Sequence, residues 1–587
     1  MTYESGTEAS YRMYKGRTSK VNILLNILLS VMIIALLVCI GLLSWVPPVS
    51  RDALTHHLLV PKIYLQHGKM VELPQIGFSY YPMNLDLLYI LPLYFGNDIL
   101  PKFIHFTFGL LTAGLIFGFL KKRFNVTYAL LGVLMFLSMP IIIKLSTTVY
   151  VDLGLVFFTT AALFYLIKWH ESCCASKYLI FSAVFCGLAL GTKYNGLVTF
   201  FILSVFVPVV YLRSHPKGPA AQVRAVGWAV VYALVALLIF SPWMIRNVYW
   251  TGNPVFPLYN RIFRTASSTT QKPLPAEVRQ EIEARTGDWN HIAVRRIVYK
   301  ESWGEIAMVP LRIFLQGKDN DPKYFDGKLN PFLLLLPIFA FFPRRKDLPI
   351  GHFERRLLLY FVLLFLLISF LRTSIRIRYI VPVLPALIIL SVAGFHNLVG
   401  ILKTVRTPMA VRCGTTIAAT IVLILFGMNT IYLVDQFKLV DPFSYLSGKL
   451  DRETYITRFR SEYPVMKYAN IHLGGGSKIL GLYLGNRRYY CDRDIISGED
   501  ILTKAVLLAS GVDEVRQSLV DRGFTHVMAN LDLVRQWVAT LNGRERGIAV
   551  GFINQCLKAL DTNRSYVLYE LKSLPAVNQD IVLESHG

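Results

Sequence analysis

Long apolar runs separated by polar connections fill the chain up to about residue 433. A transmembrane helix needs roughly 20 apolar residues, because ~30 Å of hydrocarbon is crossed at ~1.5 Å per residue. The run from Val21 to Val46 has this length, and no small-residue cleavage site follows it, so we expect a retained membrane helix. Further apolar runs lie near 101–120, 126–146, 153–170, 177–191, 197–212, 223–243, 329–343, 357–371, 379–401 and 413–433. Together these runs predict about eleven membrane spans.

Basic side chains gather in connections that fall on a single side when the spans alternate across the membrane. The clusters are Arg12, Lys15, Arg17 and Lys20; Lys121, Lys122 and Arg123; Lys168 and Lys177; Arg213, Lys217 and Arg224; Arg344, Arg345, Lys346, Arg355 and Arg356; and Lys403, Arg406 and Arg412. The positive-inside rule makes that side cytoplasmic, and it includes the N-terminal segment 1–20.

Three large segments then fall on the opposite side: 47–100, 244–328 and 434–587. The second of them contains a helix-like stretch at Ala276–Arg296. The third alternates short apolar runs with helix-like stretches, at Lys478–Leu484, Val512–Arg522, His526–Ala529 and Val534–Leu541. This alternation predicts a small extracytoplasmic α/β domain at 434–587, following a membrane domain at 21–433.

Composition agrees with a membrane protein. Of the 587 residues 54% are hydrophobic and 17% charged, and the mean hydropathy is +0.46. Soluble domains carry about 25% charged residues, so a disordered chain is excluded and an ordinary soluble enzyme is disfavoured. The net charge of +24 raises the question of nucleic-acid binding, but the charges form short separate loops rather than one basic face.

Cysteine usage indicates neither a metal centre nor a dense disulfide framework. The seven cysteines are Cys39, Cys173, Cys174, Cys186, Cys413, Cys491 and Cys556, and none shows zinc-like spacing with histidine. Only Cys491 and Cys556 fall in an exported segment, where an oxidising compartment would permit a disulfide between them. The sequence leaves that pairing open.

Ionisable residues gather where the expected spans meet the outer face. Asp52 follows the first span, and after Pro47 and Pro48 a new helix capped by Ser50 is expected over Ala53–Gln66, lying in the membrane interface. Asp152 opens the fourth span on the same face. Charges at such sites are costly and commonly functional. The alternative is that each carboxylate only stabilises a helix N-terminus through the dipole.

Several cations on the outer face break the positive-inside pattern. They are Lys193 in GTKYNG, Arg246 beside Asn247 after the seventh span, and Arg372, Arg376 and Arg378 in LRTSIRIRYIVPVLPAL. Arginine suits bidentate contact with phosphate. The alternative partners are anionic lipid headgroups or the carboxylates of the outer face.

Taken in order, these segments resemble the GT-C glycosyltransferases. The resemblance covers roughly 20–405 and is carried by the two Asp residues, GTKYNG, PWMIRNVYWTGNP and RYIVPVLPAL. It is nearest to the protein-mannosyltransferase-like branch, glycosyltransferase families 39 and 83, which includes the bacterial aminoarabinose lipid A transferase. It implies a polytopic α-helical GT-C membrane fold, and the 434–587 segment fits only loosely.

The resemblance also implies an activity and roles for individual residues. Such enzymes move a sugar from a polyprenyl-phosphate carrier to an acceptor on the exported side, usually with inversion. Asp52 would be the catalytic base with Asp152 beside it, although many relatives carry Asp-Glu where Ala53 follows Asp52 here. The implied phosphate-binding residues are Lys193, Arg246, Arg372, Arg376 and Arg378. The substrate-pocket candidates are His56, His57, Tyr81, Asn247 and Tyr379, with Tyr81 open to the alternative of an interfacial anchor.

The residue types fit this chemistry. An acceptor hydroxyl attacks the anomeric carbon while its proton passes to a carboxylate. The phosphate leaving group is already a stable anion, so cations that stabilise its developing charge replace a general acid. No cofactor is required by this scheme, and the question of a divalent metal stays open.

Other functions make different predictions. A flippase or transporter of lipid-linked sugars predicts ionisable residues near mid-membrane and a repeat between the two halves. A glycan polymerase or ligase predicts Arg-rich outer loops without an Asp base, and a non-catalytic assembly protein predicts tolerance to loss of all these charges. The expected partners of the glycosyltransferase are a polyprenyl-phosphate sugar, a lipid, glycan or protein acceptor, and the bilayer. The expected location is a bacterial inner membrane with the C-terminal domain in the periplasm.

Overall fold

The computed structural model describes residues 20–215, 218–263, 291–343, 348–372, 375–402 and 408–572. Several sequence-based expectations fall outside these residues. They concern the N-terminal segment before Lys20, most of the helix-like stretch at Ala276–Arg296, and the basic residues at 217, 344–346, 403 and 406.

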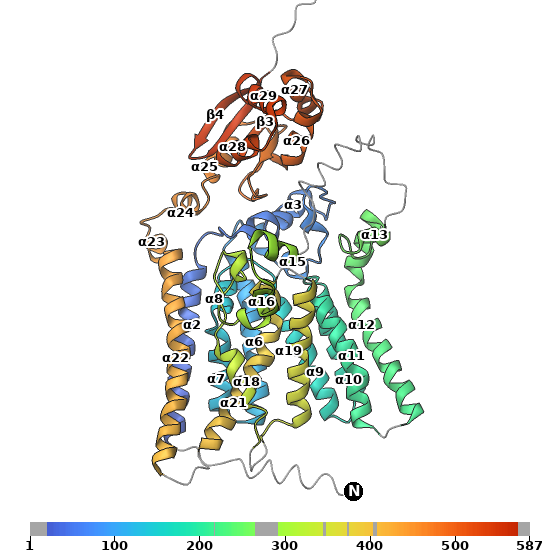
Figure 1. The fold of residues 1–587 in the computed structure, drawn as a ribbon, viewed down its shortest axis with the longest axis vertical. Helices are drawn as coiled ribbons and strands as arrows, with labels where there is room; N and C mark the ends of the chain where they lie inside the picture. The colour runs from blue at the N-terminus through green and yellow to red at the C-terminus, as the bar shows by residue number, and fades with distance from the viewer. Residues whose placement is uncertain are drawn as a thin grey trace, which may run out of the picture.

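A bundle of long helices forms the larger part of the molecule, and a smaller α/β unit lies beyond one end of it (Figure 1). The bundle helices are α2 (Lys20–Ser44), α6 (Leu100–Arg123), α7 (Val126–Leu137), α8 (Pro140–Ser146), α9 (Asp152–Glu171), α10 (Ser176–Leu190), α11 (Gly196–Ser214), α12 (Pro219–Thr251), α18 (Phe332–Phe339), α19 (His352–Arg372), α21 (Leu384–Leu402) and α22 (Pro408–Val440).

The predicted membrane spans form helices of different length and straightness. Within the described residues six are long and apolar enough, or seven if α7 and α8, which bend by 67° at their junction, form one span. The other runs do form helices, but α18 has 8 residues and α10 has 15, and the first turn of α19 is charged. Each predicted apolar run is therefore helical in the described part of the chain, including the run at 413–433 in α22, although some of these helices are short or bent.

Small residues allow the bundle helices to approach closely. A Cβ on Gly187 of α10 would lie 2.6 Å from the carbonyl oxygen of Ala236 on α12, and one on Gly394 of α21 would lie 1.9 Å from that of Leu336 on α18. Such contacts are typical of helix packing in membranes, where small side chains let backbones meet.

Short elements connect the helices at the end that faces the α/β unit. After α2 come η1 (Ala53–His57), α3 (Leu59–His67), η2 (Gly77–Tyr80), α4 (Asn84–Leu88) and α5 (Ile90–Tyr94). Later connections contain α13 (Asn260–Phe263), α15 (His291–Ala293), η3 (Val294–Val298), α16 (Trp303–Ala307), α17 (Val309–Arg312), η4 (Pro322–Tyr324), α20 (Ile377–Ile380) and η5 (Val381–Val383).

The helix expected over Ala53–Gln66 is present, but a π-helical turn interrupts its start. The N–H of Leu58 donates to the carbonyl oxygen of Ala53 at 2.9 Å, which closes an i to i+5 turn. Ser50 takes part through its backbone, whose carbonyl oxygen accepts from the N–H of Leu54 at 3.2 Å, rather than through a side-chain cap. Single π turns of this kind recur at functional sites.

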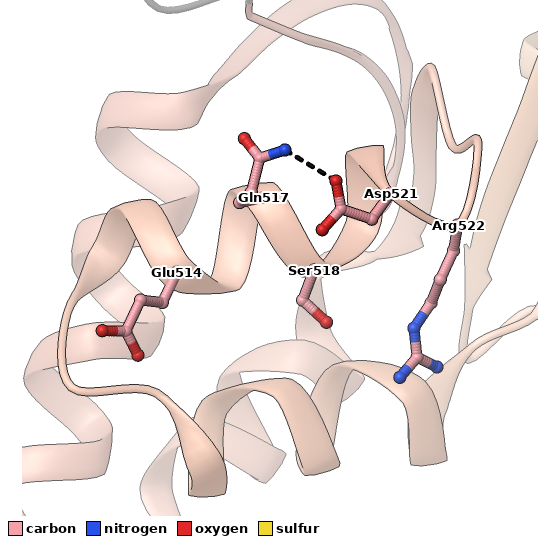
Figure 2. Close-up of a pocket in the computed structure, with 5 residues that line it drawn as sticks. All are labelled: Glu514, Gln517, Ser518, Asp521 and Arg522. Atoms are coloured by element: carbon pink, nitrogen blue, oxygen red, sulfur yellow. Dashed lines mark hydrogen bonds between the residues drawn. The ribbon is translucent and has the colours of Figure 1, made fainter. Parts of the chain in front are cut away.

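The C-terminal unit is the predicted α/β domain. After α23 (Pro442–Leu446), α24 (Arg452–Phe459) and α25 (Tyr463–His472), its strands and helices are β1 (Lys478–Leu482), β2 (Asp494–Ser497), α26 (Glu499–Leu508), α27 (Val512–Val520), β3 (His526–Asn530), α28 (Leu531–Ala539), α29 (Gly543–Gly551), η6 (Phe552–Cys556), β4 (Leu557–Asn563) and β5 (Tyr566–Leu571). The sheet order is β2-β1-β3-β5-β4, with β1 parallel to both neighbours and β5 antiparallel to both of its own. The surface of α27 carries a depression lined by Glu514, Gln517, Ser518, Asp521 and Arg522 (Figure 2).

Cys491 and Cys556, which were expected to permit a disulfide, are free thiols. Cys491 packs with Val465 and Met528, whereas Cys556 packs with Val515 and Phe552 in a separate hydrophobic cluster of the domain. Burial raises the pKa of the Cys491 thiol to about 11, so this thiol is protonated and unreactive at neutral pH.

A loop of the α/β domain docks on the segment that follows α2. Tyr489 is buried among residues of η1 and α3, and its N–H donates to the carbonyl oxygen of Leu54 at 3.2 Å. Lys62 of α3 pairs with Asp492 at 2.7 Å, and the hydroxyl of Tyr490 donates to the carbonyl oxygen of Pro48 at 2.8 Å. The domain therefore contacts the backbone on both sides of Asp52.

Candidate active site

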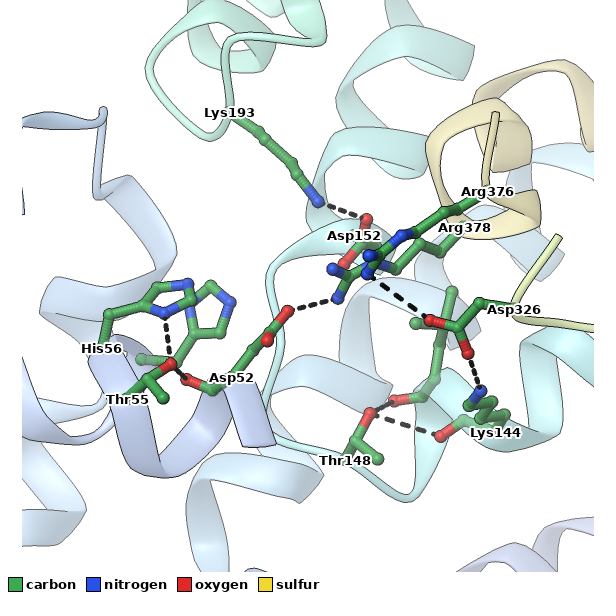
Figure 3. A network of polar contacts seen from close by, with 12 residues as sticks. Asp52, Thr55, His56, Lys144, Thr148, Asp152, Lys193, Asp326, Arg376 and Arg378 are labelled. Atoms are coloured by element: carbon green, nitrogen blue, oxygen red, sulfur yellow. Dashed lines mark hydrogen bonds and ion pairs between the residues drawn. The ribbon is translucent and has the colours of Figure 1, made fainter. Parts of the chain in front are cut away.

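Asp52 forms an ion pair with Arg378, and Figure 3 shows the two side chains pointing toward one another. Asp52 lies at the start of the π-helical turn η1, and Arg378 lies on the short helix α20. Their side chains are 22% and 12% exposed, so water screens the pair only in part. Burial acts to raise the pKa of Asp52, but the charge and hydrogen bond of Arg378 outweigh it and hold that pKa well below the ordinary value. Asp52 is therefore ionised at neutral pH.

The second carboxylate, Asp152, pairs with Lys193. Asp152 is the first residue of α9, and Lys193 lies in the tight connection between α10 and α11. The Lys193 Nζ atom lies 2.7 Å from Asp152 Oδ1. The Asp152 side chain is only 1% exposed, and its other oxygen, Oδ2, has no hydrogen-bond partner among the described residues. A buried carboxylate with a free acceptor oxygen is a costly arrangement, which makes a purely helix-capping role for Asp152 less fitting.

A third set of charges adjoins these two pairs and was missed in the sequence. Arg376 Nη1 lies 3.6 Å from Asp326 Oδ2, and Lys144 Nζ lies 3.1 Å from both Asp326 and Asp319. Figure 3 shows Arg376, Asp326 and Lys144 connected in this order, next to the Asp52–Arg378 pair. Lys144 stands in the apolar sequence PIIIKLS, and a lone cation in such a run was the signal that could have revealed the set.

Two aromatic rings lie against the cations of the cluster. The Tyr379 ring lies 5.2 Å from both the Lys193 ammonium and the Arg378 guanidinium, and the Tyr150 ring lies 5.3 Å from Arg378. These distances fit cation–π contact. Tyr379 thus joins the cluster as expected, whereas Tyr150 was not identified from the sequence.

Arg246 and Asn247 lie in a neighbouring layer and hold the loop that carries Tyr81. Arg246 Nη2 donates to the carbonyl oxygen of Tyr80 at 2.7 Å, and Asn247 Nδ2 donates to the same oxygen at 2.9 Å. The Tyr81 ring packs at 5.0 Å from that of Tyr194. These hydrogen bonds give Arg246 backbone partners where a phosphate contact was expected.

The two histidines of the π-helical turn are buried, and each has a polar partner. His56 Nδ1 lies 2.8 Å from the hydroxyl of Thr55, and its ring stacks on Phe78. His57 Nδ1 lies 2.6 Å from Asp86 Oδ1, and Asp86 is itself 2% exposed. Burial and the neighbouring His57 lower the pKa of His56 well below its usual value, so His56 is neutral.

Buried hydrogen bonds fix the start of α9, where Asp152 lies. His105 of α6 accepts from the N–H of Leu153 at 2.9 Å through Nε2, and its Nδ1 lies 3.0 Å from the carbonyl oxygens of Leu145 and Thr148. The Tyr89 hydroxyl donates to the carbonyl oxygen of Tyr150. His105 was not identified from the sequence, because its contacts with residues 40 or more positions away leave no local sequence pattern.

The predicted site residues thus divide into three groups. Asp52, Asp152, Lys193, Arg376 and Arg378 come together at one place (Figure 3), Tyr379 lies against Lys193 and Arg378, and His56 and His57 lie on the same turn as Asp52. Tyr81, Arg246 and Asn247 form the adjoining layer. Arg372 is the last residue of α19, and its side chain lies outside the described residues. Within the described ranges, no group of three or more His, Cys, Asp or Glu side chains is arranged to hold a metal ion.

The architecture is that of the GT-C glycosyltransferases. The apo form of ArnT from Cupriavidus metallidurans superposes with a TM-score of 0.55 at 14% identity, covering 93% of this chain and 97% of the other. ArnT from the same organism bound to undecaprenyl phosphate gives 0.51 at 14% identity over 92% and 97%. The Archaeoglobus fulgidus oligosaccharyltransferase tethered to an acceptor peptide gives 0.49 at 12% identity over 89% and 71%.

Sequence comparison identifies the same group. Residues 54–251 match the family of dolichyl-phosphate-mannose-protein mannosyltransferases, and no curated protein sequence matches the chain. The predicted resemblance to GT-C glycosyltransferases is confirmed by this match and by the fold. The chain is a multi-pass membrane protein with a small C-terminal sheet.

Proposed function

We propose that this protein is a membrane glycosyltransferase that moves a sugar from a polyprenyl-phosphate carrier to an acceptor hydroxyl, with inversion, using Asp52 as general base. The observation that supports it most is the alternation of carboxylates and cations, in which Asp52 pairs with Arg378 and Asp152 pairs with Lys193 beside it. A site that activates a hydroxyl and stabilises a departing phosphate needs both kinds of group.

In this proposal some of the cations bind the phosphate and one positions a loop. Arg378 and Lys193 are assigned to the leaving phosphate, because they lie beside Asp52 and Asp152 at the centre of the cluster. Arg376, 33% exposed and only loosely paired with Asp326, is the third phosphate ligand. Arg246 becomes a positioning residue for the Tyr81 loop, and Arg372 keeps its predicted phosphate role on sequence alone.

The polyprenyl carrier is supported by the place of the cluster and by a relative. Asp52 and Arg378 lie where short interfacial elements meet the ends of membrane helices, so a prenyl tail can remain in lipid while its phosphate reaches Arg378. One of the similar ArnT structures holds undecaprenyl phosphate. We extend that ligand class to this chain.

The same proposal sets the orientation of the protein. We place the N-terminus in the cytoplasm, the cluster and residues 434–587 on the periplasmic side, and the chain in a bacterial inner membrane, because the basic clusters favour this topology. In this arrangement 21–433 is the catalytic domain. Residues 434–587 are proposed to position the Asp52 segment through Tyr489 and Lys62.

The test is transfer by Asp52→Asn in purified, lipid-reconstituted protein. A panel of undecaprenyl-phosphate-linked sugars is supplied as donor, and release of undecaprenyl phosphate is followed by mass spectrometry. Asp52→Asn should lose about 10²- to 10⁴-fold in kcat. Asp435→Asn, which removes an exposed carboxylate on α22, is the matched control and should transfer at the wild-type rate. Full transfer by Asp52→Asn would reject the assignment and favour a polymerase or ligase without an Asp base.

A further inference from the structure

A buried histidine–carboxylate pair stands beside Asp52, and neither member has been given a role in proton transfer so far. His57 ends the π-helical turn that Asp52 begins, and its Nδ1 lies 2.6 Å from Asp86 Oδ1 on α4. His57 is 6% exposed and Asp86 2% exposed. A π turn closes between residues five apart, so Asp52 and His57 stand one turn apart on the same side of the helix.

The Asp86 contact selects one form of the imidazole. A carboxylate accepts from an N–H, so Nδ1 carries the hydrogen and the unprotonated Nε2 is left as the acceptor. Nε2 makes no hydrogen bond to any described residue. Once protonated, the ring would be stabilised as an imidazolium by the buried Asp86 carboxylate.

Asp52 alone is poorly suited to keep a proton. Its ion pair with Arg378 favours the charged carboxylate, so a proton received from the acceptor must leave quickly at neutral pH. An imidazole is the side chain that most often accepts and returns a proton in enzyme reactions.

We propose that His57, oriented by Asp86, is the residue on which the acceptor's proton comes to rest during transfer. This inference rests on the proposed function. The acceptor oxygen bonds to the anomeric carbon, the bond from that carbon to the phosphate oxygen breaks, and its electron pair stays on the phosphate. The hydroxyl proton passes through Asp52 to Nε2 of His57, and the imidazolium returns it to water after the products leave.

Several charged or titratable groups face His57 and set its proton affinity. They are Asp52 and His56 on its own turn, Asp86 on α4, Tyr150 ahead of α9 with its ring at 5.6 Å, and His105 on α6. Asp86 is the only one in direct ionic contact with the ring among the described residues. It is therefore the group to change when the proton affinity of His57 is tested.

The experiment is the pH profile of kcat/KM for His57→Gln and Asp86→Asn in the reconstituted full chain, with the undecaprenyl-phosphate sugar that wild type uses. Wild type should lose activity on acidification, because a protonated His57 cannot accept the proton of the acceptor. His57→Gln should lower kcat/KM by about 10²-fold or more and abolish this acidic limb. Asp86→Asn should move the limb to lower pH, because the carboxylate that favours the imidazolium is gone.

Controls separate a proton-accepting role from a structural one. His67→Gln, at an exposed histidine of α3, should retain both rate and limb, and all variants should bind undecaprenyl phosphate like wild type. An unchanged acidic limb in His57→Gln would overturn the inference even if the rate falls. If His57→Gln does not fold, Asp86→Asn decides, and an unshifted limb rejects the role. Loss of transfer in Asp52→Asn with a normal His57→Gln profile would reject this inference alone, whereas full transfer by Asp52→Asn would reject the proposed function.

Discussion

Arg378 and Asp52, 326 residues apart in the sequence, meet as an ion pair at the centre of the charged cluster. The pair brings α20, which precedes the buried helix α21, against the π-helical turn η1, which follows α2. In this pair Arg378, the proposed ligand of the donor phosphate, is already bound to a carboxylate. In the proposed function, a donor phosphate would therefore compete with Asp52 for Arg378.

Removing Arg378 should impair donor use more than folding. Hydrogen bonds to charged groups contribute about 1.5–3 kcal/mol, so Arg378→Ala should weaken undecaprenyl phosphate binding by about 10- to 100-fold. Arg378→Lys should recover part of the loss, because it keeps the charge without the planar fork. Arg458→Ala, which removes an exposed arginine paired with Asp441, is the matched control. Binding measured by isothermal titration in nanodiscs that is equal for Arg378→Ala and wild type would contradict a phosphate role.

Lys193 should matter for stability as well as for transfer. Its removal leaves the buried Asp152 carboxylate without its 2.7 Å partner, and breaking such a pair costs about 3–5 kcal/mol. Lys193→Met should therefore lower the thermal midpoint in detergent. The double variant Lys193→Met/Asp152→Asn should regain much of that loss, because the stranded charge is gone. A double variant no more stable than Lys193→Met would mean that the two residues are not coupled.

The carboxylates and cations that were expected on the outer face could be singled out because they break a regular pattern along the sequence. Asp52, Asp152, Lys193, Arg376 and Arg378 stood out as charges where the positive-inside rule expects few, and the structure brings these five side chains together. Sidedness is a property of order along the chain, so it can be read without three-dimensional information.

The partners of these residues could not be predicted in the same way. The contacts of Asp326 with Lys144, Asp86 with His57, and Arg246 with the Tyr80 carbonyl join residues far apart in sequence, and residue type does not specify them. An outer arginine looks alike in sequence whether it holds a phosphate or a backbone oxygen. The disulfide question was likewise settled by packing, since Cys491 and Cys556 belong to different hydrophobic clusters.

Docking of the α/β domain should order the segment that carries Asp52. The Tyr489 ring is buried against η1 and α3, so Tyr489→Ala should create a cavity there and loosen residues 48–62. Faster amide hydrogen exchange in that segment, with a fall in kcat, is expected. Tyr489→Phe keeps the ring and serves as the control. Wild-type exchange in Tyr489→Ala would show that the contact does not position Asp52.

Acid should weaken the contribution of Asp52 to stability only at low pH. The pKa of Asp52 is lowered in the folded state, so its stabilising contribution is fully present above the unfolded value of about 3.9 and is lost as the pH falls through the folded one. The difference in thermal midpoint between wild type and Asp52→Asn should therefore stay constant from pH 7 to pH 5 and shrink below about pH 4. In an Arg378→Ala background the same difference should be small throughout, because the cation that lowers the pKa is missing. A difference that already fades between pH 7 and pH 5 would show that Arg378 does not hold Asp52 in its charged form.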